Sequence, residues 1–171
     1  MGNNWKITDT LTKVFADEAP DGQGSIRLST LHRETVSCVI AYFGTADWGR
    51  YWKVSVKAPE KIETRLRRVE LVPSAYPCHK EQDDNYLRIV PGMYPDLLRD
   101  LDTEGDGADK KYLTKEVPGQ WRSLWLDVTV DAELAGGDYA IVIETETEDG
   151  EKETLKADLH VVDASLPPQK L

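Results

Sequence analysis

The chain has 171 residues and a mass of 19.3 kDa, which is enough for one domain with a substantial hydrophobic core. Hydrophobic residues make up 40% and charged residues 30%, a composition that excludes collagen-like, coiled-coil and wholly disordered chains. The net charge of −10 is uneven, since residues 1–75 carry 11 basic and 9 acidic side chains while residues 76–171 carry 10 and 22, and this acidity argues against nucleic acid as a partner.

Apolar and polar residues alternate along most of the chain, which is the period of a β-strand with one buried face. This alternation predicts strands over residues 5–8, 11–15, 25–30, 34–43, 50–58, 62–72, 86–90, 122–130, 139–147 and 155–161. No stretch of ten residues has a convincing helical period. The sequence therefore predicts an all-β fold, an antiparallel two-sheet β-sandwich of the immunoglobulin or jelly-roll type with about ten strands.

The alternation also predicts which side chains point into the core. These are Val36, Cys38, Ile40 and Tyr42; Trp52, Val54, Val56 and Ala58; Leu124, Leu126, Val128 and Val130; and Leu155, Ala157, Leu159 and Val161. In residues 62–72 the apolar phase shifts between Leu66 and Val69, which suggests a β-bulge. Asp149-Gly150 is a strong hairpin-turn signal between the last two strands.

Three segments lack a strand period. Residues 17–24 have the Pro, Asp and Gly content of a surface loop. Residues 91–120 are predicted to form one long irregular loop, and loops of that length are usually functional or mobile. The tail contains Leu166-Pro167-Pro168, so we assign residues 1–163 to the sandwich and 164–171 to a linker toward a further, C-terminal domain.

The residues that usually carry catalysis or bind metals give no specific pattern. Cys38 and Cys78 are too few for a disulfide framework, and free thiols are preferred; Cys38 is expected to be a core residue and not a nucleophile. The three histidines are scattered, so no zinc site is expected. Glu34 is expected to form an ion pair with Arg33 or with a neighbouring strand.

The acidic stretch from Asp100 to Asp109 resembles a calcium loop only superficially. Counted from Asp102 or Asp100, position 12 is Leu113 or Lys111, so the bidentate Glu of such a loop is absent in both registers. With 31 carboxylates in the chain, no two stand out as an acid and base pair. The sequence therefore predicts no metal, no cofactor and no catalytic residue.

Aromatic residues are the most informative candidates for binding. Trp121 and Trp125 are predicted to lie on the polar face of their strand, where a large ring needs a cover: a sugar, a partner domain or a long loop. Trp48 lies in a predicted turn, and Tyr94 begins the segment Tyr94-Pro95-Asp96-Leu97-Leu98 in the predicted long loop. We take these four residues as candidates for carbohydrate binding or interdomain contact.

Several segments, in this order, resemble a known family. They are Lys13-Val14-Phe15, Arg33-Glu34, Tyr94-Pro95-Asp96-Leu97-Leu98, the run from Gly119 to Val128 with its Leu124-Trp125-Leu126-Asp127-Val128, Ala135-Gly136-Gly137-Asp138-Tyr139, and Ser165-Leu166-Pro167. Together they resemble the N-terminal β-sandwich domain of bacterial proteins related to the family 123 glycoside hydrolases, which overlap the uncharacterised family 4091. The resemblance spans nearly the whole chain. It implies that a catalytic α/β barrel follows the sandwich and holds the catalytic Asp-Glu pair.

The sequence thus predicts a non-catalytic accessory domain of a glycoside hydrolase, with the downstream barrel of the same polypeptide as its partner. The alternative is a carbohydrate-binding module that uses exposed Trp and Tyr platforms. A third hypothesis is a self-contained hydrolase that uses carboxylates of the acidic loop. No stretch approaches the roughly 18 to 20 apolar residues of a membrane helix, and the start lacks an export signal, so no membrane partner is expected and a cytoplasmic location is favoured.

Overall fold

The computed structural model describes residues 4–45, 50–78, 81 and 85–167, which form an all-β fold of eleven strands in two sheets. The strands are β1 (Trp5–Thr8), β2 (Ser25–His32), β3 (Thr35–Phe43), β4 (Tyr51–Lys57), β5 (Ile62–Ser74), β6 (Gly92–Asp100), β7 (Thr103–Glu104), β8 (Lys111–Lys115), β9 (Trp121–Val130), β10 (Gly137–Thr147) and β11 (Lys152–Ser165). One short 3-10 helix, η1 (Gly107–Asp109), lies between β7 and β8. The predicted β-sandwich is confirmed.

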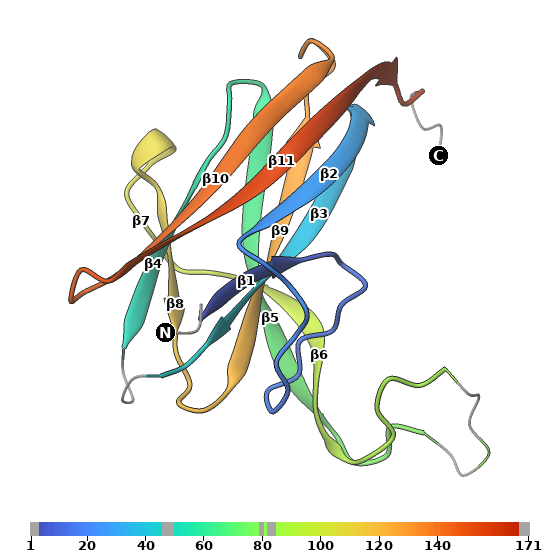
Figure 1. Cartoon of the computed structure of the whole chain (residues 1–171), viewed down its shortest axis with the longest axis vertical. Helices are drawn as coiled ribbons and strands as arrows, with labels where there is room; N and C mark the ends of the chain where they lie inside the picture. The colour runs from blue at the N-terminus through green and yellow to red at the C-terminus, as the bar shows by residue number, and fades with distance from the viewer. Residues whose placement is uncertain (1–3, 46–49, 79–80, 82–84, 168–171) are drawn as a thin grey trace.

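The five-stranded sheet has the order β1-β3-β9-β5-β6, and the six-stranded sheet has the order β2-β11-β10-β4-β8-β7. In Figure 1, β10, β11 and β2 cross in front of β3, β9 and β5, as expected for two packed layers. Within the described residues every strand pairing is antiparallel except that of β2 with β11. That parallel pair places the second strand of the chain beside the last one.

The core between the sheets is built from the alternating apolar residues of the sequence. Leu124, Leu126, Val128 and Val130 of β9 and Leu155, Ala157, Leu159 and Val161 of β11 are all at most 1% exposed. Cys38, Ile40 and Tyr42 face the same core from β3. The predicted inward faces are therefore confirmed, and their burial supplies the main driving force for folding.

Two polar groups that enter this core, Thr114 and Glu116, are paired with core aromatic residues. The Tyr42 hydroxyl shares a 2.7 Å hydrogen bond with the Thr114 hydroxyl, and burial raises the pKa of Tyr42 to about 12. The Trp52 indole N–H donates to the carboxylate of Glu116, which is 1% exposed. Trp5 stacks on Tyr42 and meets Trp52 edge-on, so these rings and their polar partners form one unit at this end of the sandwich.

The strand predicted over residues 11–15 is wrong. The Asp9 side chain accepts hydrogen bonds from the backbone N–H groups of Leu11 and Thr12, both at 2.9 Å, and this turn diverts the chain from the sheet. Residues 9–16, called here the strap, then cross the outer face of the five-stranded sheet, where Val14 is buried. The apolar residues of the strap therefore pack on a sheet without joining one.

The long loop predicted over residues 91–120 is also wrong, because it contains β6, β7, η1 and β8. β6 lies at the edge of its sheet, and its residues do not alternate between buried and exposed, so the sequence shows no strand period there. Pro95 is tolerated in β6 because an edge strand has backbone N–H groups that need no partner in the sheet. In β8 the polar residue Thr114 occupies a buried position, so the sequence of β8 does not show the alternation of apolar and polar residues that predicts a strand. The strand predicted over residues 86–90 is irregular backbone instead.

Two local predictions are corrected as well. β5 pairs with β9 without interruption from Ile62 to Val69, and the irregularity lies between Glu70 and Leu71, opposite β6. The apolar phase shifts because Val69 is buried on the outer face, not the inner one. The Glu34 carboxylate does not pair with Arg33; it accepts hydrogen bonds from the Leu31 N–H and the Thr30 hydroxyl and so closes the β2–β3 turn.

The fold analysis predicts coupling between Tyr42 and Thr114. Tyr42→Phe and Thr114→Val should each lower the free energy of unfolding by about 1 kcal/mol, because each leaves a buried hydroxyl without its best partner. The double variant should lose less than the sum of the two, which urea denaturation of the four proteins measures. Strictly additive losses would contradict the interaction.

Candidate functional site

The two outer faces of the sandwich differ in chemistry. The six-stranded sheet presents exposed ion pairs, among them Lys57–Glu144 at 2.7 Å, Lys53–Glu104 at 2.8 Å and Lys152–Glu146 at 3.0 Å. Exposed pairs of this kind contribute little to stability and are typical of a solvated surface. The candidate site described below lies on the other outer face, that of the five-stranded sheet.

The outer face of the five-stranded sheet carries a second, smaller apolar layer. Val39 and Ala41 of β3 are buried against Val14 of the strap, and Trp121 and Trp125 of β9 pack against the same cluster. The backbone N–H of Trp121 also donates to the Ala16 carbonyl at 2.9 Å, which fixes the end of the strap on the sheet. This layer covers one end of the outer face only.

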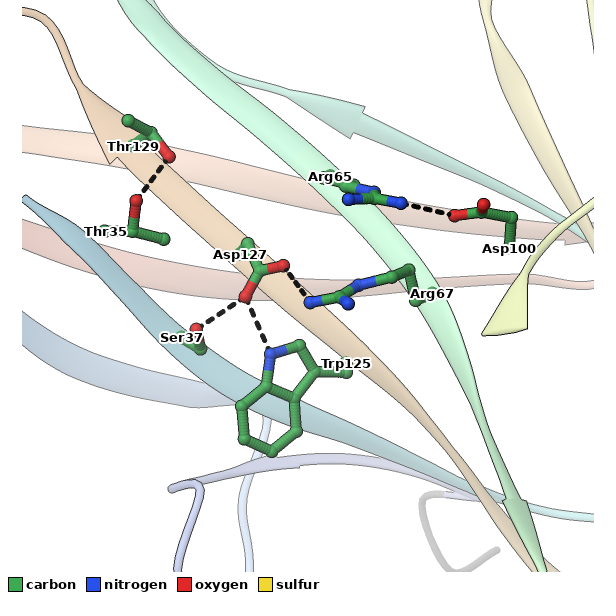
Figure 2. Close-up of polar contacts among 8 residues, drawn as sticks. All are labelled: Thr35, Ser37, Arg65, Arg67, Asp100, Trp125, Asp127 and Thr129. Atoms are coloured by element: carbon green, nitrogen blue, oxygen red, sulfur yellow. Dashed lines mark hydrogen bonds and ion pairs between the residues drawn. The ribbon is translucent and has the colours of Figure 1, made fainter. Parts of the chain in front are cut away.

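Beyond the strap, the same face holds a polar cluster centred on Asp127 (Figure 2). One carboxylate oxygen of Asp127 accepts hydrogen bonds from the Ser37 hydroxyl and from the Trp125 indole N–H, both at 2.7 Å. Its other oxygen forms an ion pair with Arg67 of β5. Three strands thus contribute side chains to one carboxylate, and the arrangement follows from the register that places Ser37 opposite Asp127.

The electrostatics of the cluster keep Asp127 ionised. Partial burial alone would raise its pKa, but the hydrogen bonds from Ser37, Trp125 and Arg67 outweigh that effect, so the pKa is lowered. Arg67 and Asp127 are 22% and 16% exposed, so this pair is less screened by water than the pairs of the other face. Asp127 is therefore an acceptor and an anchor, and a poor proton donor at neutral pH.

Two contacts flank the cluster in Figure 2. Arg65 pairs with Asp100 of β6 at 2.9 Å, with both side chains well exposed, and the hydroxyls of Thr35 and Thr129 meet at 2.8 Å. Polar side chains of four neighbouring strands, β3, β9, β5 and β6, therefore lie on one continuous face. Such a face can offer hydrogen bonds and paired charges to a protein surface or to hydroxyl groups.

The structure brings three of the four aromatic candidates to this face. The indole N–H of Trp125 donates to Asp127, and the Trp125 ring is half-buried against the apolar cluster of the strap. The ring of Trp121 packs on Phe43, and the Lys6 ammonium lies over it. Tyr94 of β6 contacts the edge of Phe15, with ring centroids 5.7 Å apart. Trp48 lies outside the described residues, as do residues 168–171 of the predicted linker.

Sequence reasoning missed Ser37, Arg67 and Asp127 as a unit. The spacing of Trp125 and Asp127 placed both on one face, but the contributions of β3 and β5 depend on strand order, which no local pattern reveals. It also missed Arg88, whose guanidinium lies 3.9 Å from the centre of the Phe15 ring. A lone arginine in an irregular segment gives no signal of such a contact.

The cysteines and His160 lie outside the polar cluster. Cys38 and Cys78 are free, and burial together with the charge of Asp127 raises the pKa of Cys38 to about 12, so its thiol is protonated at neutral pH. His160 is exposed and contacts Asp138 at 2.7 Å.

Within the described part of the chain, no group of three His, Cys, Asp or Glu side chains is placed to hold a metal ion. No helix in that part of the chain is long and apolar enough to cross a membrane.

Comparison with known proteins supports the fold. No family profile and no curated protein matches the chain. Among solved structures, a family 123 glycoside hydrolase from Clostridium perfringens that hydrolyses glycolipid glycans is similar, with a TM-score of 0.65 and 10% identity, over 95% of this chain and 28% of the hydrolase chain. At that identity the similarity establishes a shared β-sandwich and nothing about activity.

Two other solved structures are less similar to this chain. The C-terminal domain of an AgI/II polypeptide from Streptococcus agalactiae has a TM-score of 0.45 at 14% identity, over 92% of this chain and 49% of the other. The major pilin subunit of Bacillus cereus has a TM-score of 0.42 at 8% identity, over 93% and 40%. This chain thus spans less than half of each of these three proteins.

The cluster predicts a pH dependence of stability. Because the folded-state pKa of Asp127 is lowered, its contribution is present above the unfolded pKa of about 4 and is lost as the pH falls through the folded-state pKa. Asp127→Asn should therefore lower the free energy of unfolding by about 1–3 kcal/mol at pH 7, and the gap to wild type should narrow below pH 4. Urea denaturation of both proteins at pH 7, 4 and 2.5 measures the difference in the free energy of unfolding between them.

The matched control is Asp100→Asn, which changes the same chemical group in an exposed pair on the same face. Its stability should stay close to wild type at all three pH values. Equal effects of the two substitutions would show that the half-buried network around Asp127 has no special weight.

Proposed function

We propose that this chain is a non-catalytic accessory domain of a larger, glycoside hydrolase-like polypeptide, and that it packs against the catalytic domain through the outer face of its five-stranded sheet. In this role the domain buttresses its neighbour and leaves the chemistry to it. A contact of roughly 600 to 1,500 Å² is typical between domains.

The observation that carries this proposal is the fold similarity to a hydrolase of which the chain matches only 28%. A β-sandwich of this kind is thus one part of a longer enzyme in that case. The asymmetry of the outer faces supports the choice of surface, because half-buried aromatic rings and an anchored carboxylate suit a protein contact better than a lattice of exposed ion pairs does.

A carbohydrate-binding module is the second candidate, and one observation favours it. A groove beside Tyr94 also contains the half-exposed ring of Tyr86 and the polar side chains of Lys13, Asn85 and Asp96. Aromatic faces flanked by carboxylate, amide and ammonium groups have the chemistry to stack on a sugar ring and bind its hydroxyls. Trp121 and Trp125 are less suited to stacking, since both are half-buried against the strap.

The accessory role predicts that the 171-residue chain alone does not hydrolyse an aryl N-acetylgalactosaminide. The lowered pKa of Asp127 keeps it ionised in its network, so Asp127 is not poised as a general acid. Release of the aryl group should match that from Asp127→Asn and from buffer. Turnover by wild type that Asp127→Asn abolishes would overturn the proposal.

The same preparation separates the two candidate functions. Titration with oligosaccharides should give no saturable change in tryptophan or tyrosine fluorescence if the domain is an accessory scaffold. A saturable change that Tyr86→Ala removes, with Tyr51→Ala as the control for an exposed tyrosine elsewhere, would favour the binding module.

A further inference from the structure

The β5–β6 hairpin extends beyond the sandwich and forms an arm at the lower right of Figure 1, and residues 72–78 and 85–97 are its described part. This arm exposes most of the large apolar side chains that the described residues leave in solvent. Eight of the eleven lie on it: Val72, Tyr76, Tyr86, Leu87, Ile89, Val90, Met93 and Leu97. Concentration of exposed apolar groups on one element marks an interaction surface, whereas scattered ones do not.

The arm is held in place by Arg88. Its guanidinium forms ion pairs with Asp17 at 2.7 Å and with Glu18 at 3.1 Å, and it lies over the ring of Phe15. The Arg88 side chain is only 16% exposed, although the two carboxylates are largely in solvent. Beside it, the Tyr94 hydroxyl donates to the Val90 carbonyl at 2.6 Å. The Arg88 contacts tie the arm to Phe15 of the strap and to the two residues that follow the strap, and the Tyr94 bond braces the arm internally, so the apolar side chains are presented in a defined arrangement before any partner binds.

The surface of the arm is continuous with the site on the outer face. A groove of about 590 Å³ runs between the strap and the arm, lined by Phe15, Tyr86, Leu87 and Tyr94 among others. Lys13, Pro95 and Asp96 border this groove and also a smaller cleft that reaches Trp125. A partner seated on the outer face would therefore meet the arm without a gap.

The chemistry of the arm disfavours a second copy of the chain as its occupant. β6 is an edge strand, but Pro95 lacks an N–H and Asp96 is an extra residue of β6 opposite the step from Glu70 to Leu71, and both features disfavour edge-to-edge strand pairing. Each copy also carries a net charge of −10. Asp17 and Glu18 expose acidic groups over the covered Arg88, so the surface suits a partner with an apolar patch bordered by basic side chains.

We propose that the arm and its groove are the docking surface for the domain that this sandwich accompanies, a partner that is apolar at the contact and basic at its rim. This proposal rests on the proposed accessory role and adds the element that makes the contact. The sandwich face around Trp125 supplies the polar part of the interface, and the arm supplies the apolar part.

Hydrogen exchange of the arm amides tests the proposal. It is measured on the 171-residue chain and on the intact polypeptide encoded by its natural gene. Amides of residues 85–97 should exchange about tenfold or more slowly in the intact polypeptide, because docking covers them. In the intact polypeptide, the pair Leu87→Ser and Val90→Ser should remove most of that protection, since burial of one such side chain is worth about tenfold in a docking equilibrium.

Val162→Ser is the matched control, because Val162 is 39% exposed and Val90 is 56% exposed, but Val162 lies on β11 of the six-stranded sheet, away from the arm and the strap. It should leave the arm amides as protected as in wild type. Equal exchange of the arm in the short and the intact proteins, with protection around Trp125, would overturn this inference and leave the accessory role standing. A natural gene that ends at Leu171, or no protection on either surface, would overturn both.

Two further measurements on the 171-residue chain test whether a second copy of the chain or a sugar binds to the arm and its groove instead. Sedimentation equilibrium should show a monomer, and a dimer abolished by Leu87→Ser would assign the arm to a second copy. Nuclear magnetic resonance with oligosaccharides should leave the Tyr86 and Tyr94 signals unshifted. A saturable shift would assign the groove to sugar and overturn the proposal.

Discussion

A strand in a two-layer sandwich has only one face in the core, and this constraint governs the rest of the structure. β9 satisfies it on the inner side with four fully buried aliphatic residues. On its outer side the same strand carries Trp121 and Trp125, which a solvated sheet face would leave exposed. The strap covers part of these rings, and Asp127 satisfies the indole N–H of Trp125. The outer face therefore carries a partial second apolar layer, and the proposed partner domain would cover the remainder of that face.

The interior of the fold could be predicted from the sequence because burial on one side of a strand leaves a period of two. That signal gave the inward residues of β3, β4, β9 and β11 and the type of fold. It failed where a strand has no buried face, as in β6, and where a core position is polar, as at Thr114, which is buried through its bond to Tyr42. It also misplaced the strap, because Val14 is buried on a sheet without belonging to it.

The candidate site was predictable only in its aromatic residues. Outward-facing Trp121 and Trp125 are anomalous by themselves, so the pattern of one strand reveals them. The partners Ser37 and Arg67 come from strands that neighbour β9 in space but lie about 90 and 60 residues away in the chain. The clamp of Arg88 on Asp17, Glu18 and Phe15 likewise joins segments some 70 residues apart. Contacts of this range depend on strand order, and a local period carries no information about strand order.

The clamp has a consequence for how the exposed arm is tolerated. An unsupported apolar hairpin would collapse onto the sandwich or pair with other chains, and both routes would remove it from the surface. Arg88 ties the arm to Phe15 of the strap and to the residues that follow it, while Pro95 and the extra residue Asp96 disfavour regular pairing along β6. The acidic side chains of Asp17 and Glu18 add repulsion between copies. The described part of the arm thus combines exposed apolar side chains with an edge strand unsuited to regular pairing, and in the proposed assembly the partner domain would cover both.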